Sequence, residues 1–180
     1  RDVFSRLLFG GRISMTVGFL SLLIVFPIGL LYGGISGYFG GFLDTIMMRF
    51  AEAVMAIPSF YLLIILAAIL PSGMTSVQRF ALIIIILALI GWAGFARVVR
   101  GMVLSIKNED FVLAEKTIGA SNLRIILKHI LPQTTSYVII AMTLSVPSYI
   151  LAESGLSFLG LGIQQPDASW GNMLKEAQEF

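Results

Sequence analysis

Few side chains in this sequence have types that could do chemistry, and their spacing does not group them. There is no cysteine, which excludes disulfides, thiolate metal sites and cysteine nucleophiles. His129 is the single histidine, so a cluster of metal-binding histidines is excluded, and a Ser–His–Asp triad would have to use that one residue. No GxxxxGK(S/T) pattern occurs, so we do not expect this chain to cradle the phosphates of ATP. The residues predict no catalytic site, no metal site and no cofactor bound by this chain.

Two carboxylates and the histidine border apolar segments. Glu52 precedes one such segment and follows Arg49 by three residues, so we interpret it as an interfacial ion pair, with substrate or proton handling as the alternative. Glu153 ends another segment, where it could contact substrate or a binding protein, or cap local backbone. His129 is interpreted as an interfacial side chain beside Lys128.

The composition is typical of a membrane protein. The chain has 180 residues, of which 57% are hydrophobic and 12% charged, with a net charge of +2. A soluble domain is nearer a quarter charged, so these few charges cannot cover a water-soluble fold of this length. Most of the surface must face lipid or other membrane helices. The basic residues form no large soluble face, so nucleic acid is not an expected partner.

Four apolar segments approach the roughly 20 residues that a spanning helix needs, namely 15–36, 53–70, 80–99 and 133–152. They predict an all-α, polytopic transmembrane fold that forms one domain over 1–180. Pro58 and Pro147 fall inside the second and fourth segments, where each can kink the helix as a hinge or a static bend. The Gly/Pro-rich but apolar stretch 154–170 predicts a re-entrant or interfacial loop within an outer loop 153–180.

The basic residues predict the orientation. Half of the 12 Lys and Arg residues lie within 97–131, which by the positive-inside rule places the loop 100–131 in the cytoplasm. Alternation then puts Arg1, Arg6 and Arg12 outside, against the rule. The chain starts without Met and stops within a helix-like pattern, so we expect a fragment, in which a missing upstream span could have set the orientation.

The interior of this loop predicts a helix–Gly–helix elbow. Asn108 is expected to cap a first helix that starts with Glu109 and Asp110 at the positive end of its dipole. One apolar face of that helix comprises Phe111, Ala114 and Ile118. Gly119 supplies the corner.

The second limb of the elbow starts at Ser121, which can cap another short helix. Its apolar stripe comprises Leu123, Ile126, Leu127 and Ile130, and Pro132 opens the next span. One face of the elbow can lie against the spans while another is offered to a partner. An ordinary interfacial loop with solvated charges is the alternative.

A stripe of small residues marks the end of the first predicted span. Gly29, Gly33, Gly37 and Gly41 recur every four residues, which allows close approach of another helix. We expect a packing seam through Gly37, against a neighbouring span or a sister subunit, and a loop beyond it. A flexible helix end is the alternative.

The elbow resembles the EAA loop of permease subunits in bacterial ABC importers. The resemblance rests on Ala114 to Ser121 followed by Ile130-Leu131-Pro132, while Leu113 and Glu115 stand where the family pattern has Glu and Ala. Further segments resemble the dipeptide, oligopeptide and nickel branch, of the DppC/OppC type. They are RDVFSRL at 1–7, GYFGG at 37–41, MR at 48–49, AIP at 56–58, GAS at 119–121, ESGLSFLGLG at 153–162 and SWG at 169–171.

The resemblance implies a MetI-like permease fold with six spans, of which this chain would carry about four. It implies alternating-access import of peptides or a related small solute, such as nickel or a glutathione-like compound, across the inner membrane of a bacterium or archaeon. The implied partners are a second homologous permease subunit, two cytoplasmic ATPase subunits that use ATP and Mg²⁺, and an external solute-binding protein. The implied ATPase-coupling residues are Glu109, Asp110, Phe111, Ala114, Glu115, Gly119, Ala120 and Ser121.

Two other function classes fit the residues less well. An ion-coupled secondary transporter or channel without an ATPase would place ionisable groups near the bilayer midplane, and these spans lack them there. A membrane enzyme would need a nucleophile–base or metal constellation, which the sequence does not contain.

Overall fold

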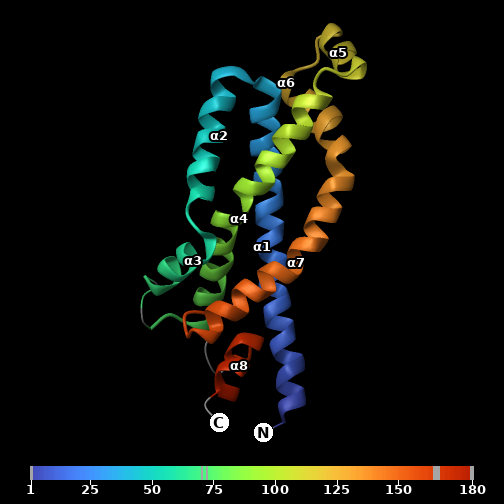
Figure 1. Ribbon diagram of the computed structural model, residues 1–180. Coiled ribbons are helices and arrows are strands. Elements are labelled where there is room, and N and C mark those ends of the chain that lie inside the picture. Colours follow the sequence, from blue (N-terminus) through green and yellow to red (C-terminus); the bar gives the residue numbers. More distant parts are fainter. Residues whose placement is uncertain (1, 70, 72, 164–166, 179–180) are drawn as a thin grey trace. The chain divides into compact units, whose positions relative to one another are not determined.

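The computed structural model describes residues 2–69, 71, 73–163 and 167–178, and these residues form helices without any strand (Figure 1). This confirms the predicted all-α fold for the described part of the chain. The elements in order are α1 (Val3–Phe39), α2 (Gly41–Ala56), α3 (Ser59–Ala68), α4 (Ser76–Ile106), α5 (Asp110–Thr117), α6 (Asn122–Arg124), a π-helix η1 (Ile125–Ile130), a 3₁₀-helix η2 (Leu131–Thr134), α7 (Thr135–Phe158) and α8 (Trp170–Gln178).

Three helical stretches are long and apolar enough to cross a membrane, namely Val3–Phe39, Ser76–Ile106 and Asn122–Phe158. A fourth span would require α2 and α3 to count together. The kink predicted at Pro58, inside the segment 53–70, is a full break in the structure, because α2 ends at Ala56 and α3 starts at Ser59. Pro58 explains this break, since its ring disfavours a helical conformation at Ile57 and it has no N–H to donate. The predicted end at residue 70 lies outside the described residues.

The chain folds as two compact units, and the long helices contribute to both. Unit 1 comprises Arg1–Ile24, Ile57–Leu89 and Leu144–Phe180, and unit 2 comprises Val25–Ala56 and Ile90–Thr143.

Within unit 2, glycines bring α1 close to α4. A Cβ added at Gly33 would lie 2.3 Å from the carbonyl oxygen of Ala96, and one at Gly37 would lie 2.8 Å from that of Arg100. At Gly29 the nearest atom would be Cδ1 of Phe95, at 2.5 Å. The three glycines therefore form a seam within this chain, where side chains would force the two backbones apart. The helix ends just beyond it, at Phe39, and Gly40 and Gly41 take the left-handed φ values of 65° and 56°.

Within unit 1, α8 lies against the first turns of α1. The side chain of Arg6 donates two hydrogen bonds to Glu176, at 2.6 and 2.7 Å, and the indole N–H of Trp170 donates to the carbonyl of Leu7 at 3.1 Å. Gly11 makes room for this indole, because a Cβ there would be 2.8 Å from the ring. Helix α1 begins at Val3, well before the predicted apolar segment 15–36.

The end of α7 differs from the predicted loop 154–170. The helix continues to Phe158, and a second helix starts at Trp170. Between them the chain turns at Gly160, whose φ is +77°. Residues 164–166 of the predicted loop lie outside the described residues.

Candidate functional site

The first limb of the elbow is α5, and its start differs by one residue from the prediction. Glu109, not Asn108, is the N-cap, with φ −68° and ψ 147°, and no side chain completes the cap. The amide of Glu109 still bonds to the carbonyl of Ile106 at 3.0 Å. Asn108 therefore lies in a turn that follows α4, and the start of α5 moves by one residue. Asp110 takes the first-turn position where a carboxylate favours the dipole.

Gly119 forms the corner of the elbow. Its φ is +80°, in the region that residues with a Cβ rarely adopt. The amide of Ala120 donates to the carbonyl of Glu115 at 3.0 Å, and that of Gly119 donates to Lys116 at 3.1 Å. This pair of bonds is the Schellman arrangement that ends a helix. Among the described residues, nothing would lie within 4 Å of an added Cβ, so the backbone conformation and not space requires glycine.

The second limb is continuous with α7, where the sequence predicted a separate short helix. Ser121 occupies the N-cap position of α6, without a side-chain bond. The helix then widens into η1, tightens into η2 and becomes α7 at Thr135. Pro132 lies in η2 and has no N–H for a regular helical bond, so a change of helix type accommodates it.

The elbow has one buried apolar face and one exposed apolar face. Val112, Ile125, Ile126 and Ile130 are buried. The exposed set, here called the elbow rim, comprises Phe111, Leu113, Ile118 and Leu123, with exposed fractions of 42%, 46%, 78% and 61%. The predicted stripe of the second limb is thus divided, because Ile126 and Ile130 pack inward while Leu123 and Leu127 do not. Large exposed apolar side chains of this kind mark contact surfaces.

The implied coupling residues fall into two groups. Glu109, Asp110, Phe111, Ala114, Gly119 and Ser121 are exposed, while Glu115 and Ala120 are only partly exposed. Glu115 points toward the second limb, where its carboxylate lies 3.5 Å from Nε2 of His129. This contact joins the two limbs across the corner, so the side chain of Glu115 belongs to the inner face of the elbow.

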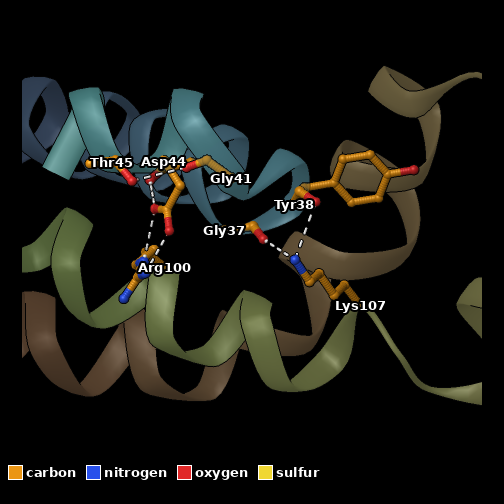
Figure 2. Close-up of polar contacts among 8 residues, drawn as sticks. Gly37, Tyr38, Gly41, Asp44, Thr45, Arg100 and Lys107 are labelled. Carbon is orange, nitrogen blue, oxygen red and sulfur yellow. Dashed lines mark hydrogen bonds and ion pairs between the residues drawn. The ribbon is translucent and has the colours of Figure 1, made fainter.

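The last turn of α1 holds the elbow at its entry and at both limbs. Lys107 follows α4 and donates from Nζ to the carbonyls of Gly37 and Tyr38, at 2.9 and 3.5 Å (Figure 2). The hydroxyl of Tyr38 donates to Oδ1 of Asn122 at 2.8 Å. The Nζ of Lys116 lies 5.4 Å from the centroid of the same ring. One helical turn thus contacts three points of the elbow.

An ion pair next to this turn joins three helices. Arg100 of α4 donates from Nε and Nη2 to the two carboxylate oxygens of Asp44 in α2, at 2.9 and 2.5 Å (Figure 2). Ser36 of α1 donates to the same carboxylate. Asp44 is buried, and its side chain is only 11% exposed. A bidentate pair of this kind is geometrically specific. It therefore joins the end of α1 and the start of α2 to α4.

The two carboxylates singled out in the sequence have different environments. Glu52 accepts a hydrogen bond from Arg49 at 3.2 Å, and both side chains are exposed. Glu153 is fully buried in unit 1 and accepts hydrogen bonds from Ser14 at 2.7 Å and from Ser157 at 2.6 Å. Among the described residues it accepts hydrogen bonds from serine hydroxyls only, and the bond from Ser14 joins α7 to α1.

Sequence reasoning missed the residues that hold the elbow. Tyr38 and Asn122 are 84 positions apart, and Asp44 and Arg100 are 56 apart. No local pattern links such pairs. Their one sequence signal is that polar side chains flank the glycine stripe and the end of α4.

Known proteins are similar to this chain over most of its length. Residues 26–180 match the family model described as "Binding-protein-dependent transport system inner membrane component". The chain is 50% identical over 176 residues to the dipeptide transport system permease protein DppC of Bacillus subtilis, covering 98% of this chain and 53% of that protein.

Two oligopeptide transport system permease proteins, both called OppC, are similar too. The identity is 43% with the one from Bacillus subtilis and 44% with the one from Haemophilus influenzae, each over 98% of this chain and 56% and 55% of the relative. The chain spans about half the length of the curated relatives it matches. Given this match over most of its length and its apolar helices, the chain is a multi-pass membrane protein that belongs to the family of binding-protein-dependent transport system inner membrane components.

Proposed function

We propose that this chain is part of a permease subunit of an ATP-driven importer for peptides, and that the elbow is its docking site for a cytoplasmic ATPase. The observation that carries the proposal is the elbow rim. Four large apolar side chains remain exposed on a segment that is fixed by a Schellman corner and by contacts to α1. A firmly held, exposed apolar surface suits insertion into a groove of a partner protein.

The wider assembly follows from the family. We propose a second homologous permease subunit, two ATPase subunits that bind ATP and Mg²⁺, and an external solute-binding protein, with 100–131 on the cytoplasmic side of a bacterial or archaeal inner membrane. The names of the relatives support peptides as the solute class; nickel and glutathione-like solutes are alternatives within the branch. The permease would perform no chemistry itself, and closure of the ATPases would move the elbow so that the spans alternate their access.

The test uses the complete transporter, purified with the ATPase subunits and reconstituted in vesicles with the binding protein. Gly119→Arg puts a bulky side chain on the left-handed corner. The space around the residue is open, but its positive φ is unfavourable for any residue with a Cβ. We expect the variant to insert and to lose peptide uptake while some ATP hydrolysis persists. Gly101→Arg, at an exposed helical glycine of α4, serves as the control for added charge and bulk.

Two outcomes would overturn the proposal. Peptide uptake at the wild-type rate in Gly119→Arg would refute the role of the corner. Uptake by vesicles that contain no ATPase, driven by an ion gradient, would place the chain among secondary transporters instead.

A further inference from the structure

The side chain of Tyr38 contacts both limbs of the elbow. Its hydroxyl donates to Asn122, the first residue of α6, and its ring lies under the ammonium of Lys116, in the last turn of α5. The corner at Gly119 lies between these two positions in the chain. Tyrosine suits this place because it combines a π face for a cation with a hydrogen-bond donor at its tip.

The entry of the elbow is joined to the same turn of α1. The last carbonyls of a helix lack partners within the helix, and a cation is favourable there. Lys107 donates to two of these carbonyls, those of Gly37 and Tyr38. Gly37 also brings this turn into contact with α4, where an added Cβ would lie 2.9 Å from Cβ of Val103.

Among the described residues, the second limb also packs against α1, because a Cβ added at Gly34 would lie 3.1 Å from Leu131 and 3.4 Å from Ile126, whereas the first limb reaches α1 at the ring of Tyr38. Nothing among the described residues lies within 4 Å of a Cβ placed at Gly119, so neighbouring side chains do not restrain the corner. The contact of Glu115 with His129 holds the limbs to each other but not to α1. Tyr38 is a side chain of α1 that contacts both limbs.

We propose that Tyr38 is a positioning residue that fixes the angle between the elbow and α1, so that a displacement of the elbow is transmitted to this helix. The proposal rests on the proposed function, because it needs an ATPase that moves the elbow. It goes beyond that function by naming α1 as the helix that receives the motion and a tyrosine as the connection.

The experiment compares Tyr38→Phe, Asn122→Ala and the double variant in the complete reconstituted transporter. Tyr38→Phe keeps the ring under Lys116 and removes only the hydroxyl. Tyr61→Phe, at an exposed tyrosine of α3, is the matched control. The first measurement is the number of ATP molecules hydrolysed per peptide taken up. We expect at least a threefold rise of this ratio in each of the three variants, with no further rise in the double variant, because both substitutions remove the same bond.

The second measurement is a spin-label distance, which needs neither peptide nor ATP. The chain contains no cysteine, so Thr117→Cys in α5 and Leu31→Cys, at an exposed position of α1, can carry the two labels in a transporter whose other subunits lack reactive cysteines. We expect the distance distribution to broaden in Tyr38→Phe and to remain unchanged in Tyr61→Phe.

The outcomes separate the two proposals. An unchanged ratio and an unchanged distance distribution in Tyr38→Phe would overturn the positioning role, as would a parallel fall of uptake and hydrolysis, which indicates a merely structural role. A wild-type assembly that takes up no peptide with ATP would overturn the proposed function, and the distance measurement would still decide whether Tyr38 holds the elbow.

Discussion

Replacing Gly33 by alanine tests the seam between α1 and α4 directly. The new Cβ would lie 2.3 Å from the carbonyl oxygen of Ala96 and 2.9 Å from Cβ of Val99. Carbon and oxygen atoms in contact are about 3.3 Å apart or more, so the helices must separate by roughly 1 Å. A gap of that size forfeits about a quarter to a half of the dispersion attraction at each atom pair. Forcing a methyl group into a packed site costs about 1–3 kcal/mol, and we expect a loss of about 2 kcal/mol.

The assay is thermal unfolding of the purified protein in detergent, followed by tryptophan fluorescence. A loss of about 2 kcal/mol lowers the apparent Tm by roughly 4–8 °C for a chain of this size. Gly101→Ala is the matched control, since it makes the same change in α4, where nothing among the described residues lies within 4 Å. There the better helix propensity of alanine raises the stability by up to about 1 kcal/mol. Equal unfolding temperatures of Gly33→Ala and Gly101→Ala would refute the packing argument.

Three further substitutions test other parts of the structure. Gly119→Ala strains the left-handed corner by about 1–2 kcal/mol, so amide exchange in 110–122 should accelerate and the apparent Tm should fall by roughly 2–8 °C; unchanged exchange would contradict a strained corner. Glu153→Leu removes the acceptor of buried serine hydroxyls and should lower the apparent Tm more than Glu153→Gln, which keeps an acceptor. Arg100→Met leaves the buried carboxylate of Asp44 without its cation, and the added change Asp44→Asn should recover part of the lost stability, whereas additive losses would show that the pair is not coupled.

The elements that could be predicted from the sequence are those with local causes. The apolar segments predicted the helices because a membrane span requires a long apolar stretch. The corner at Gly119 was predictable because left-handed backbone favours glycine. Boundaries were less accurate, since the N-cap of α5 depends on how the last turn of α4 ends, and the break at Pro58 replaced an expected kink.

The membrane character, the helical class and the presence of an elbow were predictable, because hydropathy, helix period and turn chemistry are properties of neighbouring residues. The contacts that hold the elbow appear only in the folded chain. Glu115 faces His129, 14 residues further along the chain, and the hydroxyl of Tyr38 donates to Asn122, 84 residues further along. Both contacts depend on packing that the neighbouring residues do not specify. The contact of Tyr38 depends on the glycine seam, which brings α1 close to α4. A pattern of neighbouring residues does not show which distant segments will meet.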